Sequence, residues 1–288
     1  MAITLNSLGR EQLSVAPEAL REWQRDTAAF QLHPGDLGWF WRFGTDAMTA
    51  AVRSWSRDRQ VLAVGFLDGD DIMRLTTAPG TERDEELARG VAADLTNPAR
   101  GVLPEGRVAV EAPEGAIIKD VLSEAGWLID EPWSPLQRDL TKPVEDAGVR
   151  IKVVSPALAE TRAEVQRQSF ANSRFTAENW RTMAAGPLYA DARCLLAFDD
   201  RDNAVATITV WSAGPGRPGL IEPMGTHRDH RGHGYGRAIT LAGAAALRQM
   251  GASSALVCTE SSNTAGVATY RSAGFADLPE RRDRYREA

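Results

Sequence analysis

The chain has 288 residues, of which 43% are hydrophobic and 25% charged, a globular composition with room for two domains of about 140 residues each. Its net charge of −6 argues against nucleic acid or an anionic membrane surface as the main partner. No run of about 20 apolar residues occurs, and the first residues lack a basic start and an apolar core, which disfavours a membrane helix and a cleaved leader. We therefore expect a cytoplasmic protein in which Cys194 and Cys258, each inside an apolar run, are reduced and buried.

Strands and helices alternate along the predicted chain, and a charged segment at 141–150 separates two halves, predicted as domains 1–145 and 146–288. In the first half we expect a hairpin, a helix, a strand, a helix and a strand, at 59–77, 84–95, 107–112, 115–125 and 133–140. In the second half we expect a strand, a helix, a hairpin and a strand, at 151–156, 157–170, 193–212 and 218–226. A long helix, a strand, a last helix and a polar extended tail follow, the first three at 237–250, 254–260 and 263–273.

The two halves resemble each other in the order of their elements. A shift of 148 positions places Gly274 and Phe275 on Gly126 and Trp127, and the strand at 256–260 over 108–112. Two unrelated α/β domains can share one helix and one strand by chance, but five elements in the same order favour a duplication.

The segment THRDHRGHGYGRA, residues 226–238, joins a predicted strand to a long helix. In Arg231-x-x-Gly234-x-Gly236 the glycines let the backbone approach a ligand closely, and the helix that follows directs its free N–H groups to the same point. Such a loop is suited to phosphate oxygens, although glycines before a helix are also common in plain turns. The spacing fits neither common nucleotide-binding motif, which disfavours a nucleotide-binding domain.

Two motifs together resemble the GCN5-related N-acetyltransferase (GNAT) superfamily. R-x-x-G-x-G resembles the pyrophosphate loop of that family, and Asn263, Tyr270 and Gly274-Phe275 resemble its N-x(6)-Y-x(3)-G-F pattern. The resemblance covers about 150–288 well and the first half by topology only. It implies an α+β fold with two GNAT-like domains, each a mixed, mostly antiparallel sheet flanked by helices. It also implies that the central strands of the second domain splay apart and that acetyl-CoA, as cosubstrate, lies in the gap.

The resemblance also implies residue roles. Backbone groups of Met224, Gly225 and Thr226 would contact the pantetheine arm, and Asn263 would lie near it. The loop would hold the pyrophosphate through Arg231, Gly232, His233, Gly234, Tyr235, Gly236 and Arg237. Tyr270 would lie near the sulfur. Without the resemblance, Asn263 would be read as a helix N-cap and Tyr270 as a residue packed on the sheet.

The expected chemistry is acid–base catalysis of acyl transfer. An amine must lose a proton to attack a thioester, and the departing thiolate benefits from a proton donor, for which we predict Tyr270. Glu222 is the first candidate for the base and Glu260 the second, and either can instead be a solvated acid at the end of a strand. His227, His230 and His233 lie beside arginines, so we interpret them as donors or a solvated rim and predict no metal site.

The first half lacks the loop that would bind the cofactor. Under the 148-residue shift, Arg231, Gly234 and Gly236 fall near Arg83, Glu86 and Ala88, and four acids occur within 82–86. We therefore predict a degenerate copy without cofactor. Six of the eight tryptophans lie in this half, which favours core and interdomain packing or, alternatively, walls of an acceptor pocket.

The predicted function is the direct transfer of an acetyl group from acetyl-CoA to a primary amine of a small molecule or peptide. The alternative is a CoA-binding regulatory module without turnover. The predicted partners include neither nucleic acid nor a membrane. The sequence does not specify the acceptor, the preferred acyl chain or the oligomeric state.

Overall fold

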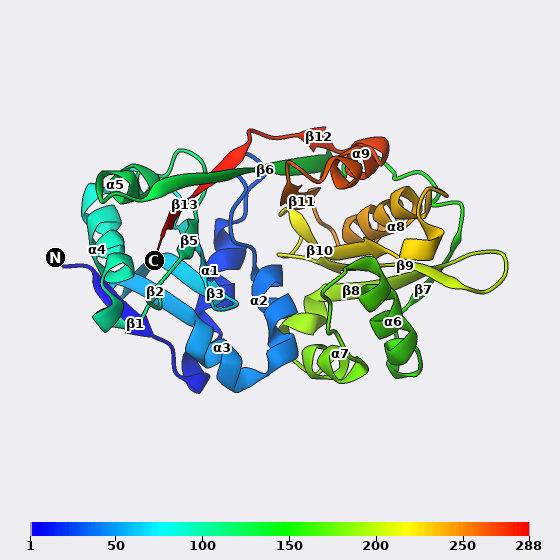
Figure 1. Cartoon of the computed structure of the whole chain (residues 1–288), viewed down its shortest axis with the longest axis horizontal. Coiled ribbons are helices and arrows are strands. Elements are labelled where there is room, and N and C mark those ends of the chain that lie inside the picture. Colours follow the sequence, from blue (N-terminus) through cyan, green and yellow to red (C-terminus); the bar gives the residue numbers. More distant parts are fainter. Residues whose placement is uncertain (1, 288) are drawn as a thin grey trace.

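The computed structural model describes residues 2–287, and its first half contains five helices and six strands (Figure 1). The strands are β1 (Thr4–Ser7), β2 (Val52–Arg57), β3 (Gln60–Asp68), β4 (Ile72–Thr77), β5 (Val108–Glu111) and β6 (Leu128–Asp139). The helices are α1 (Val15–Trp23), α2 (Pro34–Phe40), α3 (Thr45–Ala51), α4 (Glu85–Thr96) and α5 (Ile118–Glu124). In this half the sequence predicted the order of the elements from β3 to β6, but not β1, β2 or the three helices α1, α2 and α3.

The second half adds seven strands and four helices, again within the described residues. The strands are β7 (Arg150–Val153), β8 (Ala192–Phe198), β9 (Ala204–Trp211), β10 (Gly219–Thr226), β11 (Ser254–Glu260), β12 (Ala276–Asp277) and β13 (Arg281–Arg286). The helices are α6 (Ala159–Ser169), α7 (Ala177–Ala184), α8 (Tyr235–Gln249) and α9 (Thr264–Ser272). None of the helices within residues 2–287 is both long and apolar enough to cross a membrane.

All strands belong to one sheet, whose order is β1-β2-β3-β4-β5-β13-β6-β11-β10-β9-β8-β7, with β12 beside β6. Parallel pairing within the described chain occurs between β4 and β5 and between β10 and β11, and the other pairs are antiparallel. These two parallel pairs occupy equivalent places in the two halves. The mixed, mostly antiparallel sheet flanked by helices confirms the predicted fold class.

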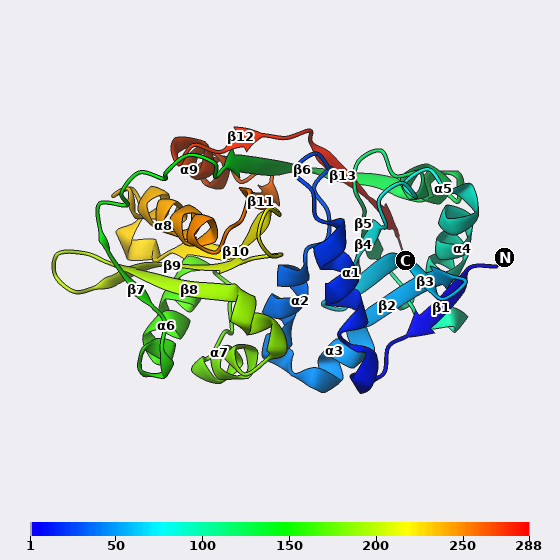
Figure 2. The same ribbon diagram turned by 180° about the vertical axis from the view of Figure 1, so that it is seen from behind.

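The two halves exchange strands where they meet. One end of β6 pairs with β13 through Leu128–Trp133, and its other end pairs with β11 through Trp133–Asp139. In turn, β13 comes from the second half and pairs with β5 of the first. Figures 1 and 2 show β6 running from the first half across to the second in both views. The division at residue 145 stays a prediction, because one sheet continues across it.

The core of the second half forms where α8 packs on the sheet. The buried face of this helix includes Thr240, Ala244 and Leu247, at successive spacings of four and three residues, as in an amphipathic helix. Gly243 allows the close approach, because a Cβ there would lie 2.6 Å from Cδ1 of Ile208 on β9. The helix ends before Gly251, whose φ of 85° a residue with a Cβ rarely adopts.

Candidate active site

The two central strands of the second half separate soon after they begin. Parallel pairing joins β10 to β11 only at Gly219 and Leu220 within the described residues, and β10 shows a register shift between Ile221 and Met224. Beyond this point β10 stays paired with β9, while β11 stays paired with β6 as far as Glu260. One edge of β10 therefore faces a gap between strands, which confirms the predicted splay.

The predicted phosphate loop lies at the start of α8. Gly232 and Gly234 have φ values of 79° and 81°, which explains the glycines at these two positions. The first hydrogen bond of the helix runs from the N–H of Ala238 to the carbonyl of Gly234, at 3.0 Å. The N–H groups of Tyr235, Gly236 and Arg237 precede that bond, so they have no carbonyl partner within the helix and are suited to bind an anion.

Side chains of this loop hold it in place. Arg231 donates to the carbonyl of Ser169 at 2.7 Å, and Arg237 donates to the carbonyl of Ser272 at 2.9 Å. His233 lies exposed beside them, with its Nδ1 2.8 Å from the carbonyl of Arg231. These two arginines therefore fix the loop to α6 and α9 through their side chains.

Gly236 has a packing role. A Cβ there would lie 3.1 Å from Cγ2 of Thr269 and 3.2 Å from Oγ1 of Thr226, so the glycine lets α8 approach α9 and β10. Gly225 on β10 also allows close packing, because a Cβ added at this position would lie 2.5 Å from the Cβ of Ser169 at the end of α6.

The remaining cofactor candidates lie on either side of the gap. Met224, on β10, is partly buried against the core of the second half. Asn263 caps α9, accepting from the N–H of Gly266 at 3.1 Å and donating to Oγ1 of Thr259 at 3.0 Å. This is the N-cap that the sequence allowed, and its nearness to the pantetheine arm stays a prediction.

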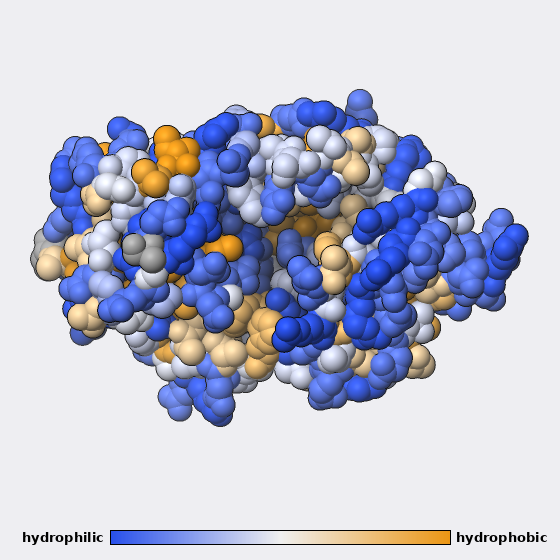
Figure 3. All heavy atoms as spheres, viewed as in Figure 1, coloured by the Kyte–Doolittle hydropathy of each residue, from blue (hydrophilic) through white to orange (hydrophobic). Residues whose placement is uncertain are grey.

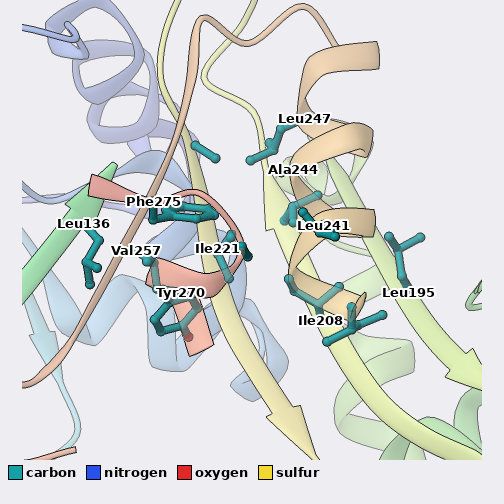
Figure 4. Close-up of a cluster of buried hydrophobic side chains, with 14 of the residues drawn as sticks. Leu136, Leu195, Ile208, Ile221, Leu241, Ala244, Leu247, Val257, Tyr270 and Phe275 are labelled. Carbon is teal, nitrogen blue, oxygen red and sulfur yellow. The ribbon is translucent and has the colours of Figure 1, made fainter. Parts of the chain in front are cut away.

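Tyr270 lies inside the core, with 6% of the residue exposed (Figure 4). Its ring centroid is 5.9 Å from that of Phe275, and its hydroxyl oxygen points away from that ring. Burial raises the pKa of Tyr270 above its ordinary value, and the nearby Glu222 and Cys258 raise it further. The side chain is therefore a neutral phenol that keeps its proton at physiological pH.

Glu222 lies on β10 at the register shift, partly buried. Its carbonyl accepts a hydrogen bond from Nε1 of Trp211 at 2.7 Å, which fixes the backbone. Its carboxyl group has neither a hydrogen bond nor an ion pair within residues 2–287. Burial raises the pKa of Glu222 to about 7, the charge of Arg74 opposes this shift, and that of Asp36 adds to it. A carboxyl with a pKa near neutrality is suited to be a general base.

A cavity of about 230 Å³ lies between the two halves, and Glu222 lines it. Figure 3 shows the hollow near the centre of the face viewed, with apolar surface at its floor. Charged side chains from both halves line it, namely Asp68, Arg74, Glu111, Asp130, Glu222, Arg281 and Asp283. Glu260 is exposed at the end of β11 and does not line this cavity. Of the two candidate bases, only Glu222 therefore faces it.

Buried ion pairs form the wall of the cavity. Arg74 lies 2.9 Å from Asp36 and 3.2 Å from Glu111, and Arg281 lies 3.0 Å from Glu111 and 3.1 Å from Asp283. Burial alone would raise the pKa of Glu111, but Arg281 and Arg74 hold it below its ordinary value. These pairs join the two halves electrostatically, since Arg281 and Asp283 belong to β13 and the others to the first half.

Cys258 also lines the cavity and is only partly buried, unlike Cys194, which is buried as predicted. Both thiols are free. Burial raises the pKa of Cys258 to about 12, so the thiol is neutral at physiological pH and unsuited to nucleophilic attack.

Residues 159–275 match the family model described as the acetyltransferase (GNAT) family. The second half belongs to the GNAT superfamily. A mycothiol acetyltransferase of Cellulomonas flavigena is 30% identical over 194 residues, which cover 62% of this chain and 53% of that protein. One of Salinispora arenicola is 27% identical over 199 residues, which cover 66% of this chain and 64% of that protein. In both cases the chain spans less than two thirds of the relative's length.

Solved structures extend the likeness to both halves. A tandem GNAT protein from the clavulanic acid biosynthesis pathway gives a TM-score of 0.62 at 15% identity, covering 99% of this chain and 98% of that one. A GCN5-related N-acetyltransferase from Sphaerobacter thermophilus gives 0.59 at 18% identity, covering 99% and 95%. At these identities the likeness shows the fold alone, here two GNAT-like units.

In the first half, the start of α4 carries carboxylates, unlike the glycine loop at the start of α8. Asp84 caps α4 by accepting from the N–H of Leu87 at 2.9 Å, and Arg57 pairs with Asp84 at 2.9 Å and with Glu86 at 3.0 Å. The N–H of Ile117 donates to the carbonyl of Glu82 at 2.9 Å, which closes the space between α4 and α5. The cavity that remains there measures about 10 Å³. Carboxylates of the chain thus occupy the helix start that would face phosphates.

We expect one acetyl-CoA to bind per chain, because α8 begins at a glycine loop without a side-chain cap, whereas the start of α4 in the first half is capped by Asp84. Isothermal titration calorimetry should give a stoichiometry near one. A stoichiometry of two would show that the first half also binds the cofactor, and would contradict its assignment as a degenerate copy.

A substitution at Gly234 tests which loop is responsible. Gly234→Asp should weaken acetyl-CoA binding at least about tenfold, because it places a carboxylate at the helix start as Asp84 does in α4. Gly234→Ala is the matched control, since it carries the same backbone strain at a φ of 81° without the charge. Equal dissociation constants for the two variants would contradict an anion site at this loop.

Proposed function

We propose that the GNAT domain transfers an acetyl group from acetyl-CoA directly to a primary amine that enters the cavity between the two halves. The observation that carries this proposal is Glu222, a carboxyl without a protein partner within residues 2–287 that faces this cavity and has a pKa near 7. The relatives named mycothiol acetyltransferase support acetyl transfer. Their acceptor is not carried over, because the match covers only part of their length.

In this proposal the cofactor lies in the gap between β10 and β11. Its pyrophosphate contacts the N–H groups of the loop from Gly232 to Arg237, and its pantetheine arm follows the backbone of Met224, Gly225 and Thr226. Two features support this placement, the free N–H groups at the start of α8 and the edge of β10 that faces the gap. When bound, acetyl-CoA supplies an activated acyl group.

The residues then divide the proton transfers between them. Glu222 takes a proton from the acceptor ammonium, directly or through water, so that the nitrogen lone pair is available for attack. Tyr270 gives its phenolic proton to the departing sulfur as the carbon–sulfur bond breaks. The second proton that the nitrogen loses as it becomes an amide restores the Tyr270 phenol. The net result is a neutral amide and free CoA as the thiol, with one proton of the ammonium left on Glu222.

The free-energy cost of proton transfer to Glu222 is smaller than the total activation barrier of a typical enzyme. An alkyl ammonium with a pKa of roughly 10.4 gives its proton to a carboxylate of pKa about 7 at a cost of about 5 kcal/mol. A turnover of roughly 10 per second corresponds to a total barrier of about 16 kcal/mol, so about 11 kcal/mol remains for acyl transfer. If Glu222 had its ordinary pKa, the proton transfer would cost more and a smaller part of the barrier would remain for acyl transfer.

The dependence of kcat/KM on pH should reveal the ionisation of Glu222. Because Glu222 must be ionised to accept a proton, we expect kcat/KM to rise with pH through about 7 and to level off above it. The measurement is thiol release from acetyl-CoA with an amine panel, with the N-acetylated product identified by mass spectrometry. A limb near the ordinary carboxyl value of about 4.5 would contradict the assignment of Glu222. Acetyl-CoA binding without any amine-dependent thiol release would contradict the proposed function itself.

A further inference from the structure

The cavity between the halves carries more negative than positive groups. Five carboxyl groups and two guanidinium groups line it. The two guanidinium groups, of Arg74 and Arg281, are 13% and 3% exposed, and each is paired with two or more carboxylates. No cation among these lining residues is therefore left for a carboxylate or phosphate of the acceptor.

Two further arginines lie near the cavity without lining it. Arg42 stacks on the rings of Trp39 and Phe43, at 4.1 and 4.3 Å, and donates to the carbonyl of Trp39 at 2.8 Å. Arg107 lies 3.8 Å from Asp130 and is 54% exposed, so it neutralises that carboxylate weakly. Even when these two arginines are counted, the carboxyl groups at the cavity outnumber the guanidinium groups.

Two weakly neutralised carboxyls of the cavity belong to different halves. Glu222 is in the second half, beside the gap between β10 and β11. Asp130 is on β6, three residues before Trp133, or about 10 Å along the strand. Because Trp133 pairs with Glu260 of β11, the direction from Trp133 to Asp130 leads away from the second half.

Apolar side chains line the same cavity as these two carboxyls. Phe30, Ile72 and Trp133 line the cavity, and Ile72 is unusual among the large apolar residues in being 37% exposed. An aromatic face also attracts cations, and Trp133 already has the guanidinium of Arg281 at 5.3 Å from its ring. The methylene groups of an aliphatic chain would cover this apolar surface.

The geometry points to an aliphatic polyamine as the acceptor, a chain with at least two ammonium groups and no carboxylate. One amine is acetylated beside Glu222, the methylene chain lies over Ile72 and Trp133, and the distal ammonium pairs with Asp130. This inference rests on the proposed function and names the class of its acceptor.

A matched panel of acceptors tests it. Initial rates of thiol release are measured with pentylamine, cadaverine and 5-aminopentanoate, which share a five-carbon chain, and with spermidine. We expect kcat/KM for cadaverine and spermidine to exceed that for pentylamine about tenfold or more, as one partly buried ion pair allows, and 5-aminopentanoate to be the poorest acceptor.

Two variants separate the binding of the distal charge from the net charge of the protein. Asp130→Asn should reduce the ratio of kcat/KM for cadaverine over pentylamine to near one. Glu131→Gln is the matched control, because this exposed neighbour lies on the same strand and loses the same charge, so its ratio should stay that of the unmodified protein.

The outcomes distinguish this inference from the proposed function. Equal kcat/KM for pentylamine and cadaverine, or an unchanged ratio in Asp130→Asn, would overturn the polyamine as acceptor and leave acetyl transfer to amines standing. Efficient use of 5-aminopentanoate would overturn it as well, since a carboxylate would then be accepted. An enzyme that binds acetyl-CoA but acetylates no amine of the panel would overturn both.

Discussion

Glu222→Gln is expected to lower kcat about 10³-fold, within the range that general-base catalysis contributes. The amide keeps the size of the side chain but cannot accept the proton of the acceptor ammonium. The limb of the pH profile near 7 should vanish with it, since Glu222 is the group whose pKa lies there. Steady-state thiol release measures kcat, and calorimetry should give an unchanged dissociation constant for acetyl-CoA.

Glu260→Gln is the matched control, because it removes the other candidate base without touching the cavity. Its kcat should stay within about twofold of the unmodified protein, as expected for a solvated surface acid. If Glu260→Gln were the inactive variant and Glu222→Gln the active one, the roles of the two acids would have to be exchanged.

Tyr270→Phe is expected to lower kcat about 10²-fold, the lower end of what loss of a general acid costs. The ring and its contact with Phe275 remain, so thermal unfolding should occur at nearly the same temperature. The raised pKa of Tyr270 keeps its proton in place across the working range, so the defect should not vary between about pH 6 and 9.

Tyr285→Phe provides the comparison, since Tyr285 lies on β13 in contact with Arg107 and away from the gap. It should retain full activity. Normal turnover in Tyr270→Phe would mean that the sulfur leaves without a protein donor, and Tyr270 would then be a residue of the core only.

The loop before α8 was predictable because its requirements are local. Two glycines with positive φ and a helix start within a few residues leave the same pattern in any chain that forms such a turn. The splayed strands followed only from the resemblance. The packing role of Gly236 was not predictable, because Thr226 and Thr269 reach it from two other elements.

The cavity could not be assembled from the sequence, because its walls come from strands exchanged between the halves. One signal was present and was missed. Arg74 lies inside the strand β4 and Glu111 ends the apolar strand β5, and a charge at such a position is buried only if it has a partner. The sequence did not show that Glu111 has Arg281 as its partner, because these two residues lie far apart along the chain. Of the tryptophans, Trp39 packs between the halves, with its ring 5.3 Å from that of Phe175.

The exchange of β6 and β13 has a consequence for how the chain is made. Strand β5 pairs with β13, about 170 residues further along, so during synthesis one edge of the first sheet stays open until nearly all the described chain has been translated. Open strand edges invite pairing with other chains. Because β13 also carries Arg281 and Asp283, the strand that closes this edge completes the wall of the cavity as well. The cavity is therefore completed late, as the two halves close on each other.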